Sequence, residues 1–160
     1  MDDGIDVEAL YRRFGPMVLR RCRRLLCNED DAMEVAQEVF VSLVRNKRRL
    51  DDRFPSALLF RMATNLCLNR IRNRRHDPAL PGDEVLHRIA GWKDLDAPLF
   101  LDALFRREPV STRTMAVIHF VDGFTHEQVA RITGLSVSGV RKRLRGLRER
   151  LEELSERRKR

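Results

Sequence analysis

The sequence has few aromatic residues, no CxxC pair and no long apolar run, and each absence excludes a class of protein. Only 6% of the 160 residues are aromatic, and glycine and proline are sparse, which disfavours a β-sandwich. No apolar run approaches the roughly 18 residues that span a bilayer. The first ten residues, MDDGIDVEAL, lack the apolar centre of a signal peptide. The 42% of hydrophobic residues suffice for one ordinary domain or two small helical ones.

The three cysteines are odd in number and have no metal-site spacing. Cys22, Cys27 and Cys67 are typical of reduced thiols in a cytoplasmic protein. Zinc binding through Cys22 and Cys27 is the alternative interpretation. We expect no metal site and no cofactor.

Motifs of catalysis are also missing. The four histidines are scattered, and His126-Glu127 continues as QVA, so there is no HExxH metal site. The sequence has neither a glycine-rich phosphate loop nor a GxSxG elbow. We therefore expect that the protein is not an enzyme and has no catalytic residue.

The sequence is rich in positive charge, which lies in two blocks. The net charge is +8 and the pI about 10.4. Residues 55–77 hold five arginines against one aspartate, and residues 109–160 hold twelve basic residues against six acidic ones. The segment between them, 78–108, is net acidic by two charges. Two basic blocks around an acidic spacer favour two contacts with one polyanion, nucleic acid before a membrane surface.

Helical periodicity runs through the chain and predicts an all-α fold of two small domains joined by a linker. We expect Asn28 to end the first helix and Ser56 to cap the third. DPALPGD, residues 77–83, is the clearest linker sequence. The expected domains are 1–77 and 98–160, with the linker at 78–97. The expected helices cover residues 7–26, 29–46, 56–75, 98–107, 112–121, 125–133 and 136–154, with a short one near 84–90.

The segment THEQVARITGLSVSGVRKRL predicts a helix-turn-helix. Thr125 is placed to cap the first helix, Gly134 to end it in the left-handed conformation, and Ser136 to cap the second helix. A helical wheel places one apolar stripe on the second helix: Val140, Leu144, Leu147, Leu151 and Leu154. We expect this stripe to pack inward, although its leucines could instead begin a short dimeric coiled coil.

The opposite side and flanks of that second helix are polar and basic, and residues 136–148 contain no acidic side chain. A solvated face usually mixes both signs of charge, so contact with DNA is favoured over simple exposure. Arg141, Lys142 and Arg145 are expected at base edges, and Arg143 and Arg148 at phosphates. The full predicted DNA-binding set is Ser138, Arg141, Lys142, Arg143, Arg145 and Arg148.

Residues 29–46 are predicted to form a helix with two different faces. One face is apolar, with Ala36, Val39, Phe40 and Leu43. The opposite face is a mostly polar stripe: Glu34, Gln37, Glu38, Val41 and Arg45. Taken alone, this polar stripe is best interpreted as a face that is simply exposed to solvent.

Taken together, these segments resemble bacterial RNA polymerase sigma factors of the extracytoplasmic-function (ECF) type, within the sigma-70 family. Residues 10–45 are similar to region 2 of that family, whose pattern is matched by Asp31, Ala32, Gln37, Glu38 and Phe40. FRMATNLCLNRIRNRR, residues 60–75, is similar to the segment that melts and reads the −10 promoter element. The helix-turn-helix is similar to region 4, which reads the −35 element.

The resemblance implies partners and residue roles. Core RNA polymerase would be bound through its β′ clamp helices, by Glu34, Gln37, Glu38 and Val41, and through its β flap. The −10 DNA would be contacted by Arg61, Asn65, Asn69 and Arg72. Asn65 would help to hold a flipped base in a pocket partly formed by residues 47–55. Promoter DNA and an anti-sigma factor are further implied partners, and a monomer is implied for the free protein.

Three departures from the family pattern leave the details of melting and of −35 preference open. Leu58 stands where the family often has Trp, Asn69 where it often has Asp, and Gly146 where Arg is common. The alternative function is a stand-alone helix-turn-helix transcriptional regulator, which would usually dimerise on a two-fold operator.

Overall fold

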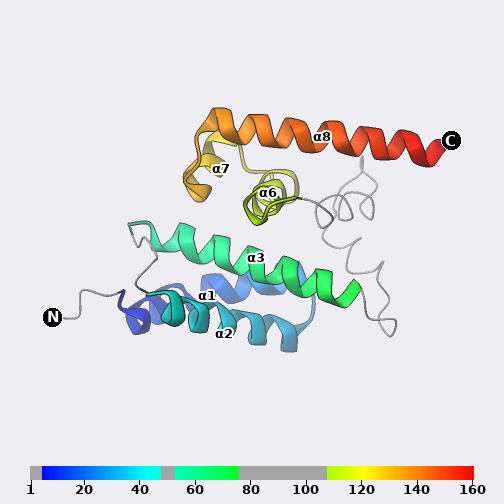
Figure 1. Ribbon diagram of the computed structural model, residues 1–160. Helices are drawn as coiled ribbons and strands as arrows, with labels where there is room; N and C mark the ends of the chain where they lie inside the picture. The colour runs from blue at the N-terminus through cyan, green and yellow to red at the C-terminus, as the bar shows by residue number, and fades with distance from the viewer. Residues whose placement is uncertain (1–4, 48–52, 76–107) are drawn as a thin grey trace. The chain divides into compact units, whose positions relative to one another are not determined.

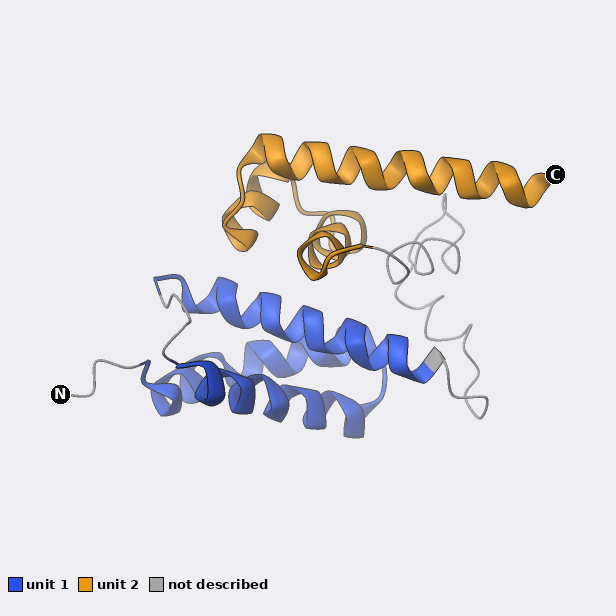
Figure 2. Ribbon diagram, in the orientation of Figure 1, with its two compact units in different colours: residues 1–74 blue, residues 75–160 orange. Residues whose placement is uncertain are grey.

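The structure, a computed structural model, describes residues 5–47, 53–75 and 108–160, and divides the chain into two compact units (Figure 2). The first unit is Met1–Arg74 and the second is Arg75–Arg160. Every regular element in the described ranges is helical, which confirms the all-α prediction (Figure 1). The predicted linker and the helices expected near 84–90 and at 98–107 lie outside these ranges.

The first two helices have the predicted bounds, because capping side chains define where each begins. Helix α1 is Val7–Leu26, and the Asp6 side chain accepts a hydrogen bond from the backbone N–H of Ala9. Helix α2 is Glu29–Asn46, and the Asn28 side chain accepts from the N–H of Asp31. The prediction that Asn28 ends α1 is wrong: Cys27 does so, in the left-handed conformation at φ 53°. Asn28 instead supplies the acceptor that opens α2.

Helix α3 is Pro55–Arg75, one residue longer at its start than predicted. Ser56 is therefore inside the helix, and its predicted role as the cap is wrong. Pro55 takes the first helical position, where a missing N–H costs nothing and the fixed φ suits a helix. The N–H of Leu58 bonds to the carbonyl of Phe54, which places Phe54 at the cap.

The core of the first unit is made by apolar faces of α1, α2 and α3. Helices α1 and α2 pack against each other, and α3 lies beside both (Figure 1). The buried residues of the three helices include Val18, Leu25, Val35, Val39, Leu43, Leu59, Ala63 and Cys67. The apolar face predicted for α2 is therefore confirmed, and it leaves the other face of α2 open to solvent.

The second unit contains α6 (Val110–Ala116), a π-helical turn η2 (Val117–Val121), α7 (His126–Thr133) and α8 (Val137–Lys159). The helix predicted at 112–121 begins two residues earlier and widens into η2. The helix predicted to end at 154 continues to Lys159. Among the described residues, no helix is both long and apolar enough to cross a membrane.

Helices α7 and α8 form the predicted helix-turn-helix. Thr125 and Gln128 make a reciprocal capping box at the start of α7. Gly134 ends that helix at φ 71°, and the Ser136 side chain accepts from the N–H of Gly139 to begin α8. Both caps and the left-handed glycine are as predicted.

The apolar stripe of α8 faces the interior of its own unit. Val140, Leu144, Leu147 and Leu151 are buried, and α8 packs against α6 and α7. Leu154 is only half-buried. Since four of the five stripe residues are already covered, the inward-packing prediction is confirmed over the coiled-coil alternative.

Candidate functional site

The outer face of α2 carries the predicted polymerase-binding residues at the surface. Glu34, Gln37, Glu38 and Val41 are all exposed. Val44, one turn beyond Val41, is also exposed, at 56% of its surface. Val41 and Val44 thus add two exposed apolar side chains to the polar stripe. Sequence reasoning missed Val44. It lies three residues after Val41, and residues three apart are neighbours on a helix surface, so the sequence could have indicated it.

A groove between α1 and α2 borders this stripe and was not predicted. Its lining includes Tyr11, Met33, Gln37 and Phe40. The Tyr11 ring packs edge-on against Phe40, with 4.9 Å between centroids. Tyr11 and Met33 are each about half exposed. The apolar surface next to Gln37 is therefore larger than α2 alone provides.

The −10 candidates lie on α3, and none of them is fully buried. Arg61, Asn65, Asn69 and Arg72 are each partly exposed. The side of α3 with Leu59, Ala63, Cys67 and Ile71 is buried. Leu66 is the exception, since it is only half-buried.

A buried arginine from α1 anchors the first half of α3. Arg21 is 5% exposed, and its Nε donates to Thr64 Oγ1 over 3.0 Å. Its guanidinium also lies 4.4 Å from the ring centroid of Phe60. A buried charge needs such compensation, so these contacts fix α3 against α1. The helical wheel cannot predict this contact, because it carries no information between helices.

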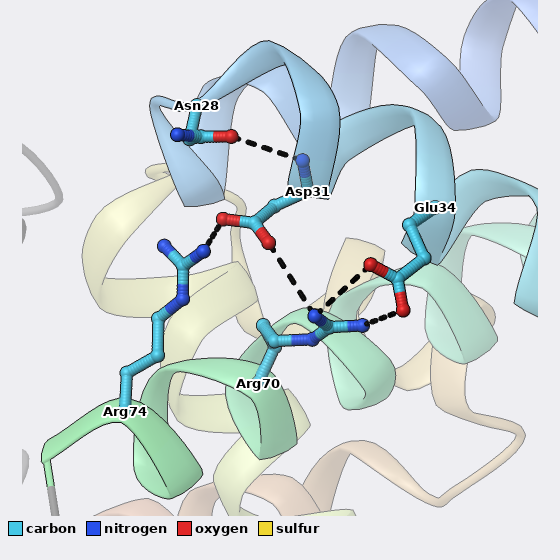
Figure 3. A network of polar contacts seen from close by, with 5 residues as sticks. All are labelled: Asn28, Asp31, Glu34, Arg70 and Arg74. Atoms are coloured by element: carbon cyan, nitrogen blue, oxygen red, sulfur yellow. Dashed lines mark hydrogen bonds and ion pairs between the residues drawn. The ribbon is translucent and has the colours of Figure 1, made fainter. Parts of the chain in front are cut away.

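Two charged residues of α2 hold the second half of α3 (Figure 3). Arg70 Nη2 lies 2.8 Å from Glu34 Oε1, and Arg70 Nη1 lies 3.4 Å from Asp31 Oδ1. Arg74 also forms an ion pair with Asp31. The hydrogen bond from Arg70 lowers the pKa of Glu34, and the same bond raises the pKa of Arg70. Glu34 therefore contacts α3 through Arg70, and its side chain is also exposed to solvent.

Cys22 and Cys27, the two cysteines of the zinc alternative, lie in different environments. Cys22 and Cys67 are both buried, whereas Cys27 is exposed. A hydrogen bond from Cys67 lowers the pKa of Cys22, and that bond together with burial raises the pKa of Cys67. Over the described residues, no group of three or more His, Cys, Asp or Glu could hold a metal ion.

The predicted DNA-contacting side chains of α8 are all exposed: Ser138, Arg141, Lys142, Arg143, Arg145 and Arg148. Two of them also contact neighbouring helices. Arg141 forms an ion pair with Glu127 of α7, and Arg143 donates to Ser111 of α6 over 2.9 Å. Within residues 5–47, 53–75 and 108–160, Lys142, Arg145 and Arg148 make no hydrogen bond or ion pair. These three cations therefore lack a counter-ion there.

Comparison with known proteins shows similarity to sigma factors. Residues 10–76 match the sigma-70 region 2 family. The chain is 28% identical to the ECF RNA polymerase sigma factor SigW of Bacillus subtilis, over 91% of this chain and 85% of that one. It is 27% identical to the ECF RNA polymerase sigma factor SigE of Mycolicibacterium smegmatis, over 91% of this chain and 60% of that one.

The resemblance drawn from the sequence is therefore confirmed. Residues 10–76 are similar to sigma-70 region 2, and the relatives aligned over nine-tenths of the chain are sigma factors of the ECF type. A solved structure of the sigma factor RpoE in complex with the anti-sigma factor NepR from Bartonella quintana is 21% identical. The match covers 94% of this chain and 97% of that one, with a TM-score of 0.46.

Proposed function

We propose that this protein binds core RNA polymerase and directs it to specific promoters to start transcription. The observation that carries the proposal is the sigma-70 region 2 match over residues 10–76, which contains the exposed stripe of α2. Relatives aligned over nine-tenths of the chain are RNA polymerase sigma factors. The polymerase supplies the chemistry, and this chain supplies the choice of promoter.

In this proposal the outer face of α2 docks on the β′ clamp helices. Gln37 and Glu38 offer polar groups, and Val41 and Val44 add apolar contact. Their exposure supports this role, since a docking residue has to be reachable in the free protein. Glu34 belongs to the same stripe, although it also contacts α3.

The proposed −10 contacts are the partly exposed residues of α3: Arg61, Asn65, Asn69 and Arg72. Amide and guanidinium groups hydrogen-bond the edges of unstacked bases and the phosphates between them. The partial exposure of these four side chains supports the assignment, because a residue that contacts unstacked bases has to be reachable.

The proposed −35 contacts are on α8, the second helix of the helix-turn-helix. A recognition helix places its N-terminal residues at base edges in the major groove. The exposed Ser138, Lys142 and Arg145 lie in that part of α8. The same unit would contact the β flap. An anti-sigma factor is proposed as a further partner, by analogy with the RpoE complex.

The proposal is tested by titrating labelled core RNA polymerase with the purified chain, alongside light scattering on the free chain. We expect a saturable complex of one chain per core enzyme and a monomer when free. A stand-alone helix-turn-helix regulator would instead give a dimer with no affinity for core enzyme.

A further inference from the structure

A cluster of opposite charges lies between α2 and α3 (Figure 3). Asp31 stands in the first turn of α2 with its side chain 9% exposed. Its two carboxylate oxygens meet two arginines of α3, Arg70 and Arg74, which are one helical turn apart. A buried carboxylate without such partners would be strongly destabilising, so Asp31 constrains where these arginines lie.

Arg70 bridges two carboxylates of α2 rather than one. Its Nη1 lies 3.4 Å from Asp31 Oδ1 and 3.3 Å from Glu34 Oε2, and its Nη2 lies 2.8 Å from Glu34 Oε1. A planar guanidinium held at several points has a defined orientation, which a lysine ammonium does not provide. The contact therefore limits both rotation and sliding of α3 along α2.

The rotation of α3 determines where the proposed −10 side chains point. At about 100° per residue, Arg70 and Arg74 lie within roughly 40° of each other around α3. Arg61, Asn65, Asn69 and Arg72 centre about 145° away from Arg70 on the same wheel. The cluster with α2 thus directs the proposed DNA face to the side of α3 away from α2.

From this arrangement we infer that Arg70 is a positioning residue, which holds α3 in the orientation needed to capture −10 bases. Glu34 acts as its counter-ion rather than mainly as a polymerase contact. This inference rests on the proposed function and revises one of its docking residues. Arg70 itself touches neither DNA nor polymerase in this account.

The test uses full-length chain reconstituted with core polymerase, and measures core affinity, closed-complex formation and promoter opening separately. Permanganate reactivity of thymines reports opening. Arg70→Met keeps the apolar stem but removes the guanidinium. We expect it to lower opening about tenfold, because the −10 side chains would no longer meet the bases in the right orientation. Core affinity and closed-complex formation should stay near wild type. Arg70→Lys restores the charge and should recover part of the opening.

Binding of a pre-melted −10 template, measured per assembled holoenzyme, gives a readout that a general loss of stability would not move. If Arg70 only stabilised the fold, Arg70→Met would reduce the amount of holoenzyme, but each complex would bind the pre-melted template normally. We expect each Arg70→Met complex to bind the pre-melted template more weakly and Arg70→Lys to recover part of that binding. Arg23→Met is the matched control, since it removes an arginine–glutamate pair, Arg23–Glu29, that does not involve α3. It should leave opening unchanged.

Glu34→Gln separates the two roles of that residue and remains informative if Arg70→Met does not fold. Because Glu34 is the counter-ion of Arg70, this change should reduce opening and leave core affinity intact. A drop in core affinity with normal opening per complex would overturn the inference and return Glu34 to the docking stripe. Unchanged opening in both Arg70→Met and Glu34→Gln would also overturn it. If wild-type chain fails to bind core enzyme, it is the proposed function that fails.

Discussion

Arg141 of α8 and Glu127 of α7 form an ion pair across 3.2 Å, with 55% and 54% of their side chains exposed. The pair joins the two helices of the helix-turn-helix. Arg141 is also a proposed base reader, so replacing it would disturb an internal ion pair as well as DNA binding. Exposed pairs are weak, about 0.2–1 kcal/mol, so the effect on stability is small. Arg145 and Lys142 are the cleaner positions for testing base recognition.

The first prediction separates base readers from phosphate contacts on α8. Arg145→Ala should reduce the difference in binding free energy between the right and the wrong base pair at one −35 position by about 1–3 kcal/mol. The reason is that alanine cannot hydrogen-bond a base edge. Arg148→Ala should weaken binding to all −35 sequences alike. It should also lower the slope of log affinity against log salt concentration by about one unit. The measurement is holoenzyme affinity on a panel of −35 variants at several salt concentrations. If Arg141→Ala, Lys142→Ala and Arg145→Ala all leave the preference unchanged, this face of α8 is only an electrostatic contact.

The second prediction concerns the docking stripe of α2. Replacing both Gln37 and Glu38 with Ala should weaken binding to core polymerase and leave the fold intact, since both side chains are exposed in the free chain. Removing one partner of a hydrogen bond in a buried interface costs about 1–3 kcal/mol. A titration of core enzyme measures the affinity, and circular dichroism checks the helices. Wild-type affinity in the double variant would remove both residues from the interface.

The third prediction concerns Asn65 on α3. Asn65→Ala should leave closed-complex formation nearly intact but impair opening, because its proposed partner is a base that has left the stack. Permanganate footprinting of the −10 region measures unpaired thymines. Asn73→Ala, at an exposed position of α3 outside the proposed site, is a suitable control. A normal footprint with normal transcription from Asn65→Ala would exclude Asn65 from −10 recognition.

The fourth prediction is about stability. Gly146 lies inside α8, where glycine costs about 0.5–1 kcal/mol relative to alanine. A Cβ there would come within 3.2 Å of Arg150 Nη1, the end of a half-exposed side chain that can shift. Gly146→Ala should therefore raise the free energy of unfolding of the second unit by about 0.5–1 kcal/mol. Chemical denaturation of the full chain measures it. A decrease would mean that the Arg150–Glu108 pair, at 2.5 Å, cannot accommodate the methyl group.

Sequence reasoning succeeded where the determinants are local. Thr125 and Ser136 each cap a helix with their own side chain, and Gly134 takes the conformation that glycine favours, all as predicted. The helix bounds of α1 and α2 and the helix-turn-helix follow from such residues. The error at Ser56 has the same local origin, since Pro55 beside it was an equally valid start for a helix.

Contacts between helices could not be predicted in this way. Arg21, Asp31 and Arg113 are charged residues that the structure buries, and a helical wheel assigns such residues to the surface. Their burial depends on which partner comes within reach in three dimensions, as Asp31 meets Arg70 of a different helix. The hydrophobic periodicity of residues 117–121 likewise does not predict the widened turn η2. The candidate site residues could be proposed from the resemblance, but the tie between Glu34 and Arg70 required coordinates.

The central claim, that this chain selects promoters for RNA polymerase, is tested most directly by transcription in vitro. Purified core polymerase is incubated with a pool of promoter fragments, with and without the chain, and the transcripts are sequenced. The account predicts chain-dependent transcripts from a subset of fragments that share −35 and −10 elements at one spacing. Transcripts that do not depend on the chain, or DNA binding by the chain without any transcription by core enzyme, would contradict it.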